Sequence, residues 1–255
     1  MINLPEMKTI TKKIIIIILF SSFAWFTYGQ PDANGILHQI DENLSSENRI
    51  FESSMTIHGR RASRTITSRS YVEGDKKSFT EYLSPPREQG TKMLKLENQL
   101  WIYSPSTDRT IQISGHMLRQ SVMGSDLSYE DMMDDRKLTE TYNAVVSGSE
   151  EFDGRTTWIL ELTARVDDVA YATRKLWVDK ERFVPLKEEL FAKSGQLLKR
   201  SVLSDVVQIE GRWFPKTIVY KDMLKQGDGT EFKVTEIKFN QDIPEYIFTK
   251  ASLKM

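Results

Sequence analysis

Most of this chain alternates apolar and polar residues in short segments separated by turn residues. In one such segment Phe51, Met55 and Ile57 fall on one face, with polar residues on the other. A period of two is typical of β-strands with one buried face, and short turns join antiparallel neighbours. We therefore predict strands near residues 50–60, 63–73, 77–83, 90–96, 99–103, 109–113, 137–148, 155–165, 171–179, 184–192, 196–208, 213–222 and 230–239.

An amphipathic helix is predicted just before the first strand. Ile36, Leu37, Ile40 and Leu44 recur at helical spacing, and Asp32 is placed to cap the first turn. The sequence holds no second long amphipathic helix to cover this apolar stripe, so a sheet must receive it. The predicted fold is mainly β, a strongly curved antiparallel sheet of about 11–13 strands whose concave face is partly filled by the helix.

Residues 114–135 interrupt the alternation, and we call this segment the insert. Ser128 resembles a helix cap, with Asp131 at the third helical position. Flexible methionines suit a cover that must repack, so we predict a mobile lid with a helical turn. Its acidic residues are interpreted as capping or solvated groups, because the spacing of a calcium-binding loop, the alternative, is absent. The apolar residues of the insert are Met117, Leu118, Val122, Met123, Leu127, Met132 and Met133.

The predicted sheet carries apolar side chains on both faces and so needs two covers. The helix and the insert supply one of them. A turn at residues 244–248 is expected to place aromatic side chains against the sheet. The remaining apolar surface would be explained by ordinary core packing, by a cavity that holds a ligand, or by a partner protein. One face groups Leu100 with Ile102, Phe232 with Val234, and Trp158 with Leu160 and Leu162; the other carries Trp101, Tyr103, Trp177, Trp213 and Phe214.

Residues 1–29 have the pattern of a secretory signal peptide. Lys8, Lys12 and Lys13 precede an apolar run, residues 14–26, that is too short to span a bilayer comfortably. We predict cleavage before Gln30 and a single domain over residues 30–255. The chain has no cysteine to acylate, so no lipid anchor is expected, and a domain of this length can bury a sufficient core without disulfides.

Charge and motifs exclude several functions. Removing the leader shifts the formal net charge from −1 to −3. The chain therefore lacks the excess positive charge that binding to nucleic acid requires. His38, His58 and His116 stand alone, and neither a GxSxG motif nor a glycine-rich phosphate loop occurs. We predict no catalytic residues, no metal and no cofactor; a catalytic triad assembled from distant residues is the alternative.

Four arginines cluster on two adjacent predicted strands. Arg60, Arg61, Arg64 and Arg69 offer two interpretations. They would either pair with acidic residues on a solvent face or neutralise a lipid headgroup or an acidic partner. The first is the ordinary role of such a cluster.

One tract resembles a known family. Residues 84–113, SPPREQGTKMLKLENQLWIYSPSTDRTIQI, and residues 123–132, MGSDLSYEDM, resemble the outer-membrane lipoprotein-sorting proteins of the LolA-like superfamily. The stretch from WIYSP to GSDLSYEDM is the specific part, and the resemblance extends over nearly all of residues 30–255. One departure is that Glu88 and Gln89 separate Arg87 from Gly90, where relatives place the basic residue directly before the glycine.

The resemblance implies an incomplete antiparallel β-barrel with a helical lid and an apolar cavity. It also implies a monomeric, periplasmic carrier without enzymatic activity, which would pass lipoprotein acyl chains or another lipid from an inner-membrane transporter to an outer-membrane acceptor. Acyl chains need only apolar walls, and burying each methylene contributes about 0.8 kcal/mol. The expected wall residues are Leu100, Ile102, Trp158, Leu160, Leu162, Phe232 and Val234, with Met117, Leu118, Met123 and Leu127 on the lid.

The same fold would also suit a different role. A module that senses lipoproteins or lipids, or that docks on an envelope transporter or signalling system, is the alternative to a carrier. Loss of a carrier should strand its cargo at the inner membrane, whereas loss of a sensor should change only a response.

Overall fold

The computed structural model describes residues 32–59 and 61–255, which belong to one compact unit. The predicted leader and Arg60 lie outside these described residues. Within them, no helix is long and apolar enough to cross a membrane.

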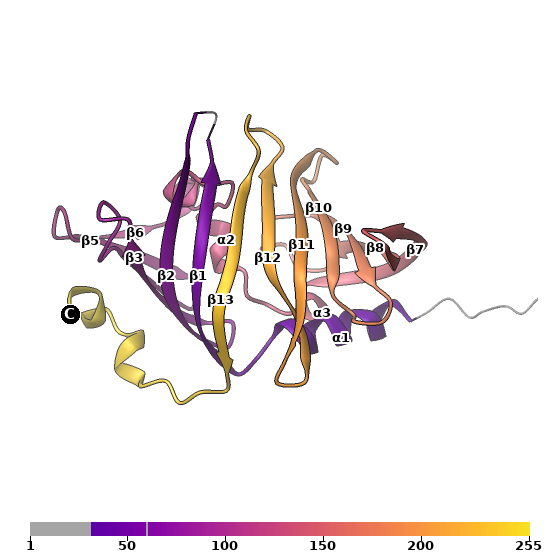
Figure 1. The fold of residues 1–255 in the computed structure, drawn as a ribbon, viewed down its shortest axis with the longest axis horizontal. Coiled ribbons are helices and arrows are strands. Elements are labelled where there is room, and N and C mark those ends of the chain that lie inside the picture. The colour runs from indigo at the N-terminus through magenta and orange to yellow at the C-terminus, as the bar shows by residue number, and fades with distance from the viewer. Residues whose placement is uncertain (1–31, 60) are drawn as a thin grey trace, which may run out of the picture. The chain divides into compact units, whose positions relative to one another are not determined.

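Thirteen antiparallel strands form one curved sheet that does not close, which confirms the predicted fold (Figure 1). The first strand, β1, pairs with the last, β13, near the middle of the sheet, and the two edges are β6 and β7. The strands are β1 (Asn48–His58), β2 (Ser63–Glu73), β3 (Lys77–Ser84), β4 (Lys92–Leu96), β5 (Gln99–Ser104), β6 (Arg109–Ile113), β7 (Tyr142–Phe152), β8 (Arg155–Ala164), β9 (Thr173–Asp179), β10 (Pro185–Phe191), β11 (Leu197–Ile209), β12 (Arg212–Asp222) and β13 (Thr230–Phe239).

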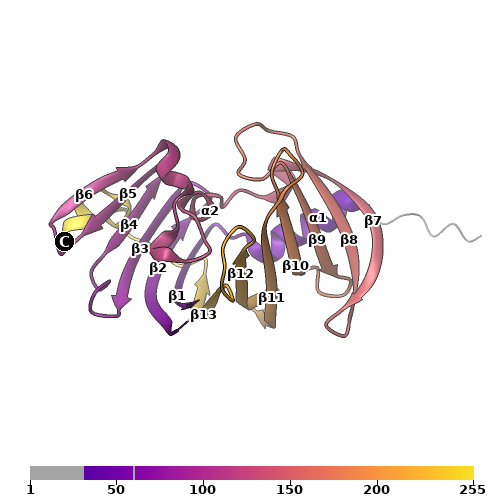
Figure 2. The ribbon, with the colours of Figure 1, turned by 90° about the horizontal axis from the view of Figure 1, so that it is seen from above.

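Helix α1 (Ala33–Leu44) fills one part of the concave face (Figure 2). Asp32 caps it as predicted, because its carboxylate accepts hydrogen bonds from the backbone N–H groups of Asn34 and Gly35, both at 3.1 Å. The apolar stripe of α1 packs on strands β7, β8 and β9. The buried members of this cluster are Ile36, Leu37, Ile40, Tyr142, Val146, Leu160, Leu162, Leu176 and Val178.

The insert connects the two edge strands and covers the other part of the concave face. It forms the 3₁₀ helices η1 (Gly115–Arg119) and η2 (Val122–Gly124) and the short helix α2 (Tyr129–Met133). Ser128 and Asp131 make the predicted capping box at the start of α2. The methionines of the insert and its buried Leu127 pack against apolar residues of β1 to β6. The buried members on these strands are Met55, Ile66, Tyr82, Met93, Leu100, Ile102 and Ile113.

One predicted boundary is wrong. The strand expected over residues 137–148 begins only at Tyr142, and the helix α3 (Leu138–Thr141) precedes it. The carboxylate of Asp41, on α1, accepts hydrogen bonds from the backbone N–H groups of Leu138 at 2.8 Å and Thr139 at 3.0 Å. The capping residue lies nearly a hundred positions away, so the sequence around residue 138 gives no sign of this helix.

The C-terminal segment supplies the second cover of the sheet. The 3₁₀ helices η3 (Glu245–Phe248) and η4 (Ala251–Lys254) pack on the face of β3, β4 and β5 that is opposite the insert. Phe248 is buried there, as expected for the terminal turn, whereas Tyr246 is 60% exposed. The buried residues of this cluster are Phe79, Leu94, Trp101, Ile243, Phe248 and Leu253.

Candidate functional site

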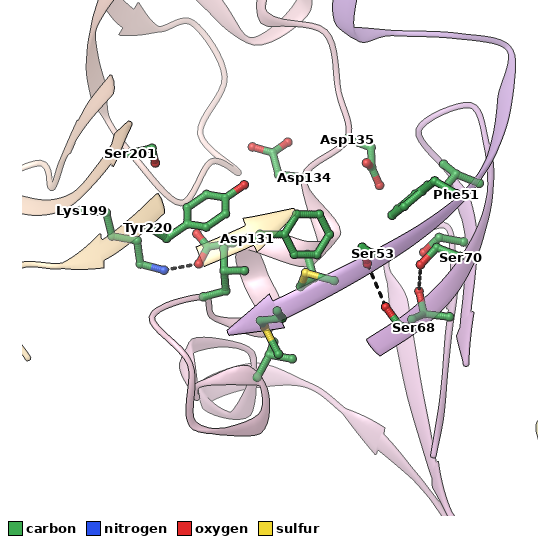
Figure 3. A pocket seen from close by; sticks show the side chains of 18 of the residues that line it. Phe51, Ser53, Ser68, Ser70, Asp131, Asp134, Asp135, Lys199, Ser201 and Tyr220 are labelled. Atoms are coloured by element: carbon green, nitrogen blue, oxygen red, sulfur yellow. Dashed lines mark hydrogen bonds and ion pairs between the residues drawn. The ribbon is translucent and has the colours of Figure 1, made fainter. Parts of the chain in front are cut away.

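A cavity of about 330 Å³ lies between the insert and the concave face of the sheet (Figure 3). This volume is at the lower end of the range for small-molecule pockets. Strands β1, β2 and β3 form one side and strands β9 to β12 the other. The large apolar residues that line the cavity are Phe51, Met55, Ile66, Val72, Tyr82, Val122, Leu127, Met132, Leu190 and Phe232.

The structure places the predicted wall and lid residues in three groups, with Val234 apart from them. Leu127 and Phe232 line the cavity itself. Leu100 and Ile102 of the sheet and Met117, Leu118 and Met123 of the insert belong to the adjoining apolar cluster, where the insert meets the sheet. Trp158, Leu160 and Leu162 pack against α1 instead and do not line the cavity, and Val234 is buried on β13 outside the cavity lining.

Much of the cavity wall is polar, which the sequence did not indicate. Ser53 and Ser68 share a hydrogen bond of 3.0 Å, and Ser70 shares one of 2.9 Å with Thr80. These hydroxyls already have hydrogen-bond partners in one another, so a ligand against this side of the wall needs no polar group to pair with them. The charged lining residues are Arg49, Asp131, Asp134, Asp135, Arg174, Glu188 and Lys199.

Three aspartates at the end of the insert pair with cations of the sheet. Asp131 pairs with Lys199 of β11. Asp134 pairs with Arg174 of β9 at 3.2 Å. Asp135 pairs with Arg49 of β1 at 2.9 Å and with Lys95 of β4 at 3.1 Å. The insert is thus held by ion pairs to both parts of the sheet.

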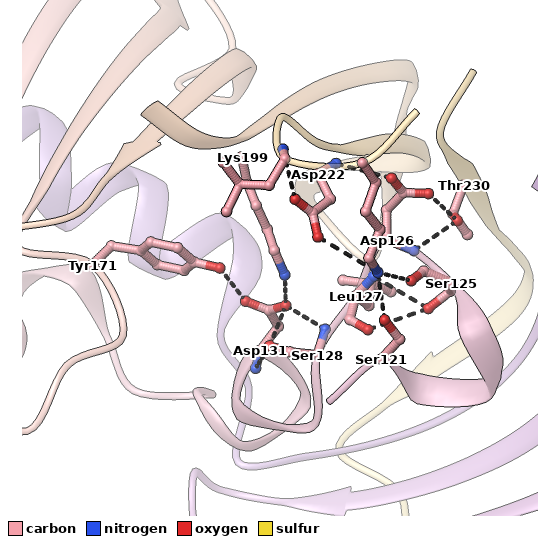
Figure 4. Close-up of polar contacts among 12 residues, drawn as sticks. Ser121, Ser125, Asp126, Leu127, Ser128, Asp131, Tyr171, Lys199, Asp222 and Thr230 are labelled. Atoms are coloured by element: carbon pink, nitrogen blue, oxygen red, sulfur yellow. Dashed lines mark hydrogen bonds and ion pairs between the residues drawn. The ribbon is translucent and has the colours of Figure 1, made fainter. Parts of the chain in front are cut away.

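Asp131 is the most connected of these groups (Figure 4). Burial, the largest single cause, tends to raise the pKa of this carboxyl. The Lys199 charge and the hydrogen bonds from Lys199, Tyr171 and Ser128 together outweigh burial, so the pKa lies below its usual range. The Tyr171 hydroxyl donates to Asp131 at 2.5 Å. Burial and the Asp131 charge in turn raise the pKa of Tyr171, which keeps this hydroxyl a donor.

The middle of the insert is anchored to β2 and to the β12–β13 hairpin. The Asp126 carboxylate accepts hydrogen bonds from the Thr230 hydroxyl at 2.8 Å and from the backbone N–H of Asp222 at 2.9 Å. Lys225 donates to the hydroxyl of Ser121 and to the carbonyl of Ser125. On the opposite flank the Arg64 guanidinium donates to the carbonyl of Met123.

These contacts correct the interpretation of the acidic residues of the insert. Capping is right for Asp131, but solvation is wrong for Asp126, Asp134 and Asp135, which are largely buried in polar contacts with the sheet. No group of acidic or histidine side chains in the described part of the chain is arranged to hold a metal ion. Of the arginines, Arg64 pairs with Glu88 and Arg69 with Glu52, the ordinary pairing expected.

Acid should loosen this anchorage through Asp131. Because the folded pKa of Asp131 lies below the ordinary value of 3.8, the stabilisation is complete above about pH 4 and is lost as pH falls through the folded pKa. We expect Asp131→Asn to increase amide hydrogen exchange in α2 at neutral pH, since it leaves the Lys199 charge buried and unpaired. Glu130→Gln, on the same turn, is the matched control, and exchange that is equal in the two variants would contradict this anchoring role.

In its fold the chain is similar to outer-membrane lipoprotein-sorting and LolA superfamily proteins of known structure. A family model described only as "uncharacterized protein" matches residues 74–255, and the chain belongs to this family. No curated protein matches the sequence.

Three crystal structures share this fold. A LolA superfamily protein from Nitrosomonas europaea is 27% identical, with a TM-score of 0.72 over 86% of this chain and 98% of its own. A domain from Vibrio parahaemolyticus described as an outer membrane lipoprotein-sorting protein is 24% identical, with a TM-score of 0.76 over 88% and 98%. A DUF1329 family protein from Desulfovibrio piger is 23% identical, with a TM-score of 0.78 over 86% and 97%.

Proposed function

We propose that the protein is a non-enzymatic periplasmic carrier that takes up lipoprotein acyl chains or another lipid in the cavity and passes them between envelope partners. The observation that carries this proposal is a cavity with apolar residues on both the sheet and the insert, Met55 and Phe232 facing Leu127 and Met132. Each buried methylene of a ligand would contribute about 0.8 kcal/mol. The lipoprotein-sorting description of the Vibrio relative supports this assignment.

The contacts of the insert support a lid that opens. Its ion pairs with the sheet are largely buried, and the cost of removing two charges from water offsets much of their attraction, so they contribute little net free energy against opening. Its apolar contacts are rich in methionine, including Met117, Met123, Met132 and Met133, whose flexible side chains can pack on different partners. Opening would enlarge a cavity that is small in the closed state.

Native mass spectrometry tests the proposal directly. We expect protein purified from the periplasm to carry bound lipid, and delipidated protein to bind a fluorescent acyl probe. If the purified protein carries no lipid and the delipidated protein does not bind acyl probes, the protein is not a carrier. Depletion distinguishes a carrier from a sensor, since only loss of a carrier should retain lipoproteins at the inner membrane.

A further inference from the structure

Three polar side chains form a row across one side of the cavity. Glu188 of β10 lies opposite Ser201 of β11 in the strand register, and Ser201 lies opposite Tyr220 of β12. Residues directly opposite each other on adjacent strands share a face and are close neighbours. All three line the cavity, and Figure 3 shows Ser201 and Tyr220 across it from Ser53, Ser68 and Ser70.

This row lacks protein partners. The Ser201 hydroxyl is buried, the residue being 2% exposed, and has no hydrogen bond. Among the described residues, neither the Glu188 carboxylate nor the Tyr220 hydroxyl has a hydrogen-bond or ion-pair partner either. A buried polar group left unsatisfied costs about 1–3 kcal/mol, so the unpaired Ser201 hydroxyl, between the unpaired polar groups of Glu188 and Tyr220 on the cavity wall, points to a ligand.

The charges of the cavity indicate the sign of that ligand. Each of the three cations, Arg49, Arg174 and Lys199, already pairs with an aspartate of the insert. The Glu188 carboxylate is the one lining charge left over among the described residues. Burial raises the pKa of Glu188, although the Arg174 charge opposes this, as expected for a carboxylate that lacks its counterion.

The hydrogen-bonding capacity of these three side chains indicates the chemical class of the ligand's polar group. A carboxylate only accepts, and each hydroxyl accepts as well as donates. Burial raises the pKa of Tyr220, with the Glu188 and Asp131 charges adding to the effect, so this phenol stays neutral. A primary ammonium, with three N–H donors, matches one carboxylate and two hydroxyl oxygens. A quaternary ammonium has no such donor, and an anion would meet the Glu188 charge.

We propose that Glu188, Ser201 and Tyr220 bind the protonated primary amine of an amphipathic ligand whose chain occupies the apolar part of the same cavity. This inference rests on the proposed function, because it assigns the polar end of that ligand. The ammonium would neutralise Glu188 and complete the hydrogen bonds of Ser201 and Tyr220. The carrier would then distinguish amino lipids or amine-bearing acyl compounds from lipids of other headgroup charge.

Displacement of a fluorescent acyl probe by three compounds of equal chain length tests the inference. We expect dodecylamine to bind at least about tenfold more tightly than dodecanol or dodecanoate, as one charge-assisted hydrogen bond would provide. Glu188→Gln should weaken dodecylamine binding at least about tenfold and so remove the preference for the amine over dodecanol. Glu189→Gln is the matched control, because Glu189 alternates to the other face of β10, where it pairs with Lys187 and Arg200.

The outcomes separate the two proposals. If the three compounds bind equally, or if Glu188→Gln keeps the preference for the amine, the ammonium site is wrong while the carrier stands. If none of them binds and the acyl probe is not taken up, the carrier itself is wrong. A variant with Ser201→Ala adds a second check: its affinity for dodecylamine should fall while its thermal stability is unchanged or higher, since it removes an unpaired buried hydroxyl.

Discussion

A disulfide between the insert and β13 should abolish the uptake of acyl chains. The side chains of Asp126 and Thr230 are in direct contact, at 2.8 Å, and the chain contains no other cysteine to compete. We expect the oxidised Asp126→Cys/Thr230→Cys protein to bind an acyl probe on the order of 100-fold more weakly, a loss of about 2.7 kcal/mol, because the insert can no longer leave the wall. Reduction should restore binding.

The control for this disulfide is a second disulfide on the face of the sheet opposite the insert, because Thr56 and Thr65 alternate with the cavity-lining Met55 and Ile66. Thr56 and Thr65 face each other on β1 and β2 and share a hydrogen bond of 2.9 Å at the exposed surface. Oxidised Thr56→Cys/Thr65→Cys should bind the probe like the parent protein. Normal uptake by the oxidised Asp126–Thr230 variant, with its disulfide verified by mass, would show that the insert is not a gate.

The second large effect concerns the predicted wall residues under α1. Leu160 is fully buried between β8 and the helix. We expect Leu160→Ala to lower the free energy of unfolding by about 2–5 kcal/mol, through lost burial and the cavity left behind, with little change in affinity for acyl probes. Denaturant titration and probe binding measure the two quantities.

Met132→Ala should show the reverse pattern. Met132 is partly buried on α2 and lines the cavity, so its loss removes apolar contact from the ligand more than from the core. We expect a fall in affinity of about tenfold and a smaller loss of stability. A strong loss of affinity in Leu160→Ala, measured where the variant is fully folded, would instead place the ligand under α1.

Local pattern was sufficient to predict the strands but not how they face one another. Alternation marked each of the thirteen strands, because burial of one face leaves a period of two in the sequence. Register decides which apolar set meets the helix and which meets the cavity. Trp158, Leu160 and Leu162 therefore looked equivalent to Phe232, and only tertiary packing separates them.

The polar side of the cavity was beyond local prediction for the same reason. Glu188, Ser201 and Tyr220 come from three strands and meet only through cross-strand pairing. Their alternation with neighbouring residues resembles that of any solvent-facing position. Asp41 of α1 likewise caps α3 through the backbone of Leu138 and Thr139, which are nearly a hundred residues further along the chain.

The pairing of β1 with β13 has a consequence for how the protein folds. In that ladder Ile57 lies opposite Thr230 and Arg49 lies opposite Phe239, so its partners are among the most distant in the chain. The middle of the sheet is completed only when the last strand has been made, and until then β1 presents an unpaired edge. Long-range pairing of this kind slows folding, and exposed edges attract other chains. We expect folding of the newly made chain to be limited by the arrival of β13.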